Sequence, residues 1–102
     1  MKRRLALSAV LSLAILAPSA MAGDGASMFL GKCGACHVKG GQAAPVNPAD
    51  KASVVWGKYF KRGRHPVDFS ATISGDDLAA VVEYLKAHAA DSDQPATAVI
   101  PK

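Results

Sequence analysis

The sequence is organised around Cys33-Gly34-Ala35-Cys36-His37, in which the chain's two cysteines are followed directly by a histidine. This C-x-x-C-H order is the attachment signature of a c-type haem. Two thiols one helical turn apart can each form a thioether with a vinyl group of the same porphyrin, and the adjacent imidazole can ligate the iron from the proximal side. The motif therefore predicts one covalently attached haem c, bound through Cys33 and Cys36 and ligated by His37.

Three other roles for the cysteine pair are open. A Cys33–Cys36 disulfide would close a very short loop and so would stabilise the fold little. A thioredoxin-like redox pair normally follows a strand of a βαβ unit, but no strand pattern precedes Cys33. A zinc site needs four ligands, and the motif offers only two cysteines and His37. Haem attachment is therefore the favoured interpretation.

Residues 1–22 have the pattern of a secretory signal peptide. A basic start at residues 2–4 precedes an apolar run over 5–17 and a small-x-small site at 20–22. The apolar run ends at Pro18 and is shorter than the ~20 residues that a membrane span needs. The sequence therefore predicts an exported, periplasmic protein with no membrane span after cleavage; retention as an uncleaved anchor is the alternative.

The charge balance excludes one class of function. The whole chain has 12 Lys and Arg against 8 Asp and Glu, a formal charge of +4. Because residues 1–22 hold three of these cations and no acid, 9 cations face 8 acids in residues 23–102, a net charge of +1. So small a charge argues against nucleic-acid binding. With three Phe, two Tyr and one Trp, the domain can bury only a modest core, which also favours a cofactor.

Residues 23–90 carry helical patterns and should form one domain. Residues 24–36 predict a helix that Asp24 can cap, and residues 48–62 predict a second helix. Ser74 is the expected N-cap of a third helix, in which apolar residues recur at helical spacing. Those residues are Leu78, Val81, Val82, Leu85 and Ala89.

The remaining segments carry no regular pattern. No stretch alternates as a strand, so the fold class expected is all-α. Residues 91–102 contain two prolines and show no apolar periodicity, and they predict a flexible C-terminal tail.

An all-α chain with C-x-x-C-H on its first helix and an amphipathic last helix resembles the class I cytochrome c family. The resemblance covers residues 25–90 and depends on Gly25 and Phe29 before the motif and on Tyr84-Leu85 in the last helix. It implies a small cytochrome c-like domain in which the first and last helices cross, with a glycine and an aromatic side chain at their contact, around one haem.

The resemblance also implies how the proximal side is built. Pro45 matches the family's proline whose carbonyl accepts a hydrogen bond from the proximal histidine, which would orient the His37 ring. Pro48 is the alternative. Trp56, Tyr59 and Phe60 form the helix face that is expected to pack on the haem, and the Trp56 indole N–H is a candidate donor to a propionate.

The distal side departs from the family. The usual sixth ligand is a methionine in the loop before the last helix, but no methionine follows Met28, which is expected to pack in the core. His65 lies in that loop and is the predicted metal ligand opposite His37. The alternatives are His88, a weakly supported Asn47, or an open sixth position.

These features together predict a one-electron carrier with bis-histidine iron ligation rather than an enzyme, because no general base or nucleophile constellation is visible. Its partners would be redox proteins. A basic cluster beside His65 can steer an acidic partner, although a solvated helix end is the simpler interpretation of most of these cations. The cluster consists of Lys58, Lys61, Arg62 and Arg64. Two alternatives are a haem-based binder or sensor of diatomic ligands and a haem subunit of a larger oxidoreductase.

Overall fold

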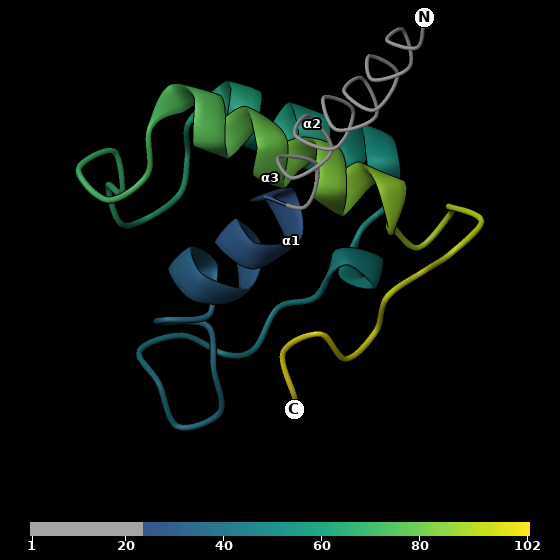
Figure 1. Cartoon of the computed structure of the whole chain (residues 1–102), viewed down its shortest axis with the longest axis horizontal. Helices are drawn as coiled ribbons and strands as arrows, with labels where there is room; N and C mark the ends of the chain where they lie inside the picture. Colours follow the sequence, from purple (N-terminus) through teal and green to yellow (C-terminus); the bar gives the residue numbers. More distant parts are fainter. Residues whose placement is uncertain (1–23) are drawn as a thin grey trace, which may run out of the picture.

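A computed structural model describes residues 24–102, and the signal peptide predicted for residues 1–22 lies outside them. The described chain is helical, with α1 (Asp24–Met28), α2 (Ser53–Arg62) and α3 (Gly75–Ala87) arranged as in Figure 1. These residues form no strand, so the predicted all-α class is confirmed. No helix among them has both the length and the apolar character needed to cross a membrane.

The ends of the helices differ from the predictions in two places. α1 does not continue to residue 36: it widens into a π-helical turn, η3 (Phe29–Cys33), closed by a 3.1 Å hydrogen bond from Gly34 N–H to the Phe29 carbonyl. The expected second helix is split into a 3₁₀ turn, η4 (Pro48–Asp50), and α2, because the backbone is extended at Lys51. π-Turns of this kind are frequent at functional sites.

The start of α3 agrees with the sequence prediction. The hydroxyl of Ser74 accepts a hydrogen bond from the Asp77 backbone N–H at 3.2 Å. Asp76 and Asp77 occupy the first turn, where carboxylates interact favourably with the helix dipole. α3 therefore begins directly after Ser74, as the sequence predicted.

α1 packs directly against α3, and Gly25 lies at the contact. A Cβ atom on Gly25 would lie 2.5 Å from the Ala80 carbonyl oxygen and 2.9 Å from the Tyr84 Cβ, so only glycine fits there. The Phe29 and Tyr84 rings meet beside it with centroids 5.7 Å apart. A glycine and an aromatic pair thus bring the first and last helices together.

We expect Gly25→Ala to destabilise the fold by about 1–3 kcal/mol, because the added methyl group must push two helices apart. Gly57→Ala is the matched control: it lies inside α2, where an added Cβ meets nothing within 4 Å. That change should be neutral or stabilising by about 0.5–1 kcal/mol. Urea unfolding of both variants measures the difference, and a Gly25→Ala protein as stable as wild type would contradict the close packing.

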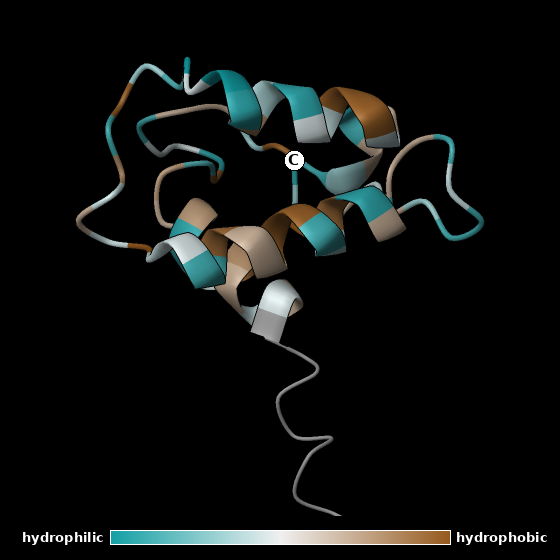
Figure 2. Ribbon diagram, turned by 90° about the horizontal axis from the view of Figure 1, so that it is seen from above, coloured by the Kyte–Doolittle hydropathy of each residue, from teal (hydrophilic) through white to brown (hydrophobic). Residues whose placement is uncertain are grey.

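The core lies between the three helices and the C-terminal segment. Figure 2 shows α2 and α3 side by side, with the residue 63–74 loop joining them at one end. The buried apolar side chains come from η3, α2, the end of the 63–74 loop, α3 and the residues that follow it. They are Phe29, Trp56, Ile73, Val81, Leu85, Ala89 and Ile100. Met28 packs against this core, as predicted.

The C-terminal segment, residues 91–102, is not the loose tail expected from its composition. It folds back along the molecule and ends beside η4 and the loop that precedes it (Figure 1). Ile100 is buried in the core with 1% of its surface exposed, and its backbone is hydrogen-bonded to the side chain of Asn47. One apolar side chain and one side-chain amide therefore anchor the end of a segment that has no periodic pattern of its own.

Candidate functional site

The cysteines lie on a tight turn that follows η3. The amides of Cys36 and His37 both donate to the Cys33 carbonyl, at 3.2 and 2.9 Å. Both side chains are half-buried and carry free thiols. Burial raises the pKa of the Cys33 thiol, so at neutral pH this group stays protonated rather than becoming a thiolate. A thiol with a raised pKa is less suited to act as a redox-active nucleophile, because the thiolate is the reactive form.

The ring of His37 is oriented by the loop that follows the motif. Its Nδ1 lies 2.8 Å from the Ala44 carbonyl oxygen, which can only accept a hydrogen bond. Nδ1 therefore carries the proton, and Nε2 keeps the lone pair with which imidazole binds a metal. The sequence predicted the Pro45 carbonyl as the acceptor, and this prediction is wrong: the acceptor is the carbonyl of the preceding residue, Ala44. The Ala43 amide donates to the Cys36 carbonyl at 3.0 Å, and this bond brings the Ala44 carbonyl to the ring.

His65 is placed by the end of α2. Gly63 adopts the left-handed conformation, with a φ of 62°, and turns the chain out of the helix. The His65 Nδ1 then lies 2.7 Å from the Val67 carbonyl oxygen and 3.3 Å from the Val67 amide. Only one of these contacts can be a hydrogen bond, and the shorter one requires the proton on Nδ1. His65 therefore has the same tautomer as His37, with the lone pair on Nε2.

The fold brings these two histidines together. The centroids of the His37 and His65 rings are 6.1 Å apart, with an angle of 66° between the ring planes. Two imidazoles on opposite sides of one metal, each bonded at about 2 Å, have centroids roughly 6 Å apart. The angle is no obstacle, because two axial rings can rotate independently about their shared axis. The spacing and the tautomers are thus compatible with both histidines holding one iron.

Aromatic side chains surround the pair. The His65 ring contacts Phe69 at 4.9 Å and Tyr59 at 6.5 Å between centroids, and Phe60 lies against both of these residues at 6.4 and 5.1 Å. All three aromatic side chains are only half-buried. Half-buried rings around two imidazoles offer apolar area to a flat macrocycle, which is the environment that a porphyrin needs. The donor set and its surroundings are therefore compatible with haem.

Two residues predicted for the haem side have other partners. The Trp56 indole N–H donates to the Pro48 carbonyl at 2.7 Å inside the protein, so the expected propionate contact is wrong for this residue. Lys51 Nζ lies 5.6 Å from the centroid of the Trp56 ring. Asn47 is fully buried and bonded to Ile100, so it is not available to the distal side.

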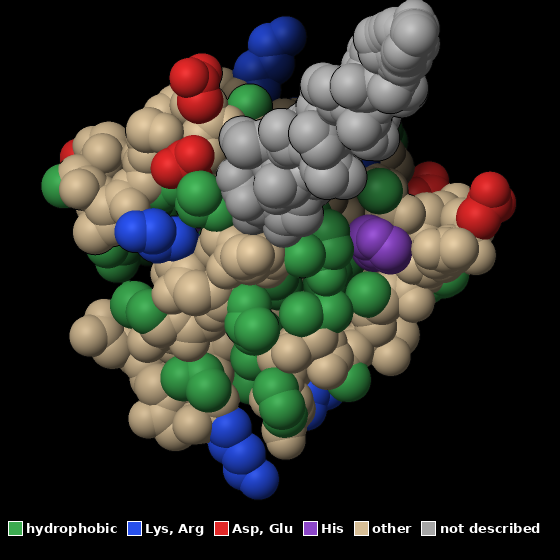
Figure 3. Space-filling model, viewed as in Figure 1, with side chains coloured by type: hydrophobic (Ala, Val, Ile, Leu, Met, Phe, Trp, Pro, Cys, Tyr) green, Lys and Arg blue, Asp and Glu red, His purple; other side chains and the backbone are tan. Residues whose placement is uncertain are grey.

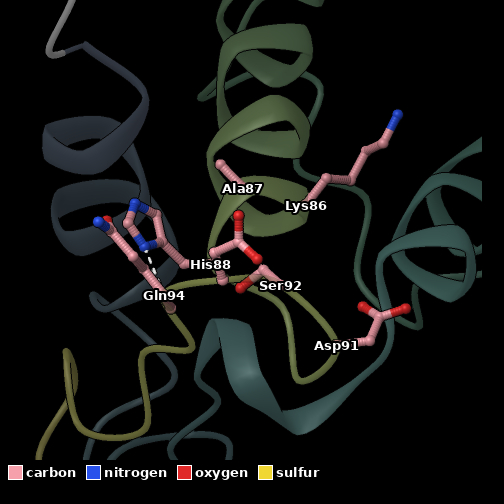
Figure 4. A pocket seen from close by; sticks show the side chains of 7 residues that line it. Lys86, Ala87, His88, Asp91, Ser92 and Gln94 are labelled. Atoms are coloured by element: carbon pink, nitrogen blue, oxygen red, sulfur yellow. Dashed lines mark hydrogen bonds between the residues drawn. The ribbon is translucent and has the colours of Figure 1, made fainter.

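His88 lies at the C-terminal end of α3, where its ring packs on Tyr84 at 5.0 Å. It lines an open pocket of about 520 Å³, and its Nδ1 donates to the Gln94 carbonyl at 2.8 Å (Figure 4). Lys86 and Asp91 line the same pocket. Among the ring contacts within residues 24–102, His65 rather than His88 is the histidine beside His37.

Sequence reasoning missed Phe69 and the Ala44 carbonyl. Phe69 is the only Phe, Tyr or Trp between residues 63 and 74 and lies four positions after His65, and this isolation was a usable signal. The role of Ala44 has no side-chain signature, because a backbone carbonyl acts there.

Charged groups lie mostly at the edge of the face seen in Figure 3, and hydrophobic side chains gather nearer its middle. The four cations of the basic cluster are all exposed. Within residues 24–102, no three His, Cys, Asp or Glu side chains form a group able to hold a metal ion by themselves. A metal on the histidine pair would need its remaining ligands from elsewhere, as a porphyrin provides. Comparisons of the chain with protein families, curated proteins and solved structures gave no match.

Proposed function

We propose that this protein is an exported monohaem c-type cytochrome that carries one electron between partner proteins. The observation that carries the proposal is the 6.1 Å spacing of the His37 and His65 rings, each with its Nδ1 proton on a backbone carbonyl. Cys33 and Cys36 would hold the haem covalently, and the two histidines would ligate its iron. The bound iron supplies the one-electron chemistry by changing between its ferric and ferrous states.

The protein's own residues supply orientation and burial. The Ala44 carbonyl fixes the ring of His37 and increases its basicity through the Nδ1 hydrogen bond. The Val67 carbonyl does the same for His65. Two imidazoles without a thioether favour the ferric state more than a histidine–methionine pair does, so the reduction potential should be low for this class.

A partner would dock near the histidine pair. Val38 and Val67, close in sequence to the two ligands, are 38% and 62% exposed. The exposed cations of the basic cluster lie on the C-terminal half of α2 and, with Arg64, at the start of the loop that contains His65. With two haem propionates, the net charge of +1 on residues 23–102 would become about −1, so this local patch, not the net charge, would steer an acidic partner. Export to the periplasm is part of the proposal, since it is where bacterial c-type haem is attached.

The absorption spectrum of the purified, reduced protein with and without carbon monoxide tests this function. We expect a low-spin spectrum that the gas does not change, because both axial positions are filled by histidine. A spectrum that changes at once on addition of the gas would instead indicate an open sixth position and favour a sensor of diatomic ligands. A preparation with no haem absorption would refute both.

A further inference from the structure

The C-terminal segment is fastened to the chain around η4 at several points. The Ala49 amide donates to the Ala96 carbonyl at 2.9 Å, and the Ser53 amide donates to an Asp91 carboxylate oxygen at 2.8 Å. The Ala96 amide in turn donates to the His88 carbonyl at 3.0 Å, where the segment leaves α3. These bonds span positions far apart in sequence, so the segment is a strap across the domain.

The strap ends in a clamp between Asn47 and Ile100. The Asn47 side-chain oxygen accepts from the Ile100 amide at 2.8 Å, and its Nδ2 donates to the Ile100 carbonyl at 3.0 Å. The backbone N–H of Asn47 donates to Asp50 Oδ2 at 2.8 Å. Asn47 has no exposed surface and Ile100 has 1%. A buried amide left without hydrogen-bond partners destabilises the fold. The Asn47 side chain and the Ile100 backbone therefore depend on each other for their hydrogen bonds.

The clamp is connected to the proximal histidine by a short, stiff piece of backbone. Ala44, whose carbonyl accepts the His37 Nδ1 proton, lies three positions before Asn47. Pro45 lies between them, and its ring restricts the backbone. Ile100 also lies near the motif, because a Cβ atom added to Gly34 would be 3.7 Å from the Ile100 Cδ1. Movement of Asn47 would therefore move the carbonyl that orients His37.

We propose that Asn47 and Ile100 are positioning residues for the proximal histidine, so that the C-terminal strap is part of the iron site. The proposal depends on the proposed function, since it assigns His37 as an iron ligand. The clamp holds the Ala44 carbonyl against the ring and keeps the Nδ1 proton hydrogen-bonded. Hydrogen bonds of this kind to ligating histidines typically change site affinity or activity 10–100-fold.

Hydrogen exchange in the reduced holoprotein tests the clamp. The Nδ1 protons of His37 and His65 are both bonded to backbone carbonyls, so the second is an internal reference for the first. In Asn47→Ala we expect the His37 proton to exchange roughly tenfold faster relative to the His65 proton, because a net loss of about one hydrogen bond makes local opening roughly tenfold more frequent. Ile100→Pro, which removes the N–H that Asn47 accepts, should have the same effect.

The double variant and a control separate positioning from general loss of stability. Asn47→Ala combined with Ile100→Pro should change the exchange ratio no more than Ile100→Pro alone, because that substitution already breaks the clamp together with the buried Ile100 side chain. Val81→Ala is the control: it opens a cavity at a fully buried position of α3 and leaves the clamp intact. Its exchange ratio should equal that of wild type.

An unchanged ratio in Asn47→Ala, or an equal rise in Val81→Ala, would overturn the proposal. The haem absorption of the same samples tests the proposed function separately. If that absorption is absent, the backbone amide of Ala43, which donates to the Cys36 carbonyl, still reports on the clamp. In that case Asn47→Ala should raise the exchange rate of the Ala43 amide roughly tenfold relative to that of the Leu78 amide, which lies at the start of α3. The same Ala43-to-Leu78 ratio in the variant and in the wild type would refute the clamp.

Discussion

Replacing His65 with Ala should convert the reduced protein from a low-spin form that does not bind carbon monoxide into a high-spin form that binds it. The side chain that faces His37 at 6.1 Å is lost, and the rest of the His65 loop remains. A wild-type protein that the gas does not change must release His65 for less than about 1% of the time, so the variant should bind the gas with an apparent affinity more than about 100-fold higher. Titration of the reduced protein with carbon monoxide, followed by absorption, measures this.

His88→Ala is the matched control for that titration. It removes a histidine from the far end of α3, where the ring is bonded to the Gln94 carbonyl and packs on Tyr84. Its spectrum and affinity should equal those of wild type. If His88→Ala becomes high-spin while His65→Ala does not, the assignment of the two histidines is wrong.

Loss of both cysteines should abolish covalent haem attachment completely. In Cys33→Ala/Cys36→Ala neither thioether can form, so haem would be held only by its two axial ligands and packing. Mass spectrometry under denaturing conditions should show the wild-type chain with the added mass of one haem and the double variant without it. The double variant should also unfold at lower temperature, because a domain of this size depends on such a staple.

Ala35→Ser controls for disturbance of the motif, since Ala35 is exposed between the two cysteines. That variant should keep the haem mass. A wild-type protein whose mass equals that of the polypeptide alone would contradict haem attachment, and a mass two hydrogens lower would indicate the Cys33–Cys36 disulfide instead.

Several features follow from local sequence because their physics is local. The start of α3 depends on a hydroxyl that accepts from an amide three positions later, and Ser74 does so. The end of α2 depends on a glycine that tolerates positive φ, and Gly63 has it. The distal candidate His65 followed from the resemblance to the family, through its place in the loop before the last helix.

Partners distant in sequence could not be predicted. The Trp56 indole was expected at a propionate but donates to Pro48, because burial requires the nearest carbonyl to satisfy it. The carbonyl that accepts from His37 was predicted to be that of Pro45 but is that of Ala44, because the Ala43–Cys36 hydrogen bond determines which carbonyl reaches the ring. Neither outcome has a side-chain pattern that a reader of the sequence could recognise.

By itself, the sequence determined the all-α class, the Ser74 cap of α3 and the glycine that ends α2, because these depend on residue type and short spacing. Only the tertiary structure decided that His65 meets His37 and that residues 91–102 form a strap rather than a tail. The strap depends on Asn47 and Ile100, 53 positions apart. Such pairings arise from burial of polar and apolar groups together, and burial is a property of the whole fold.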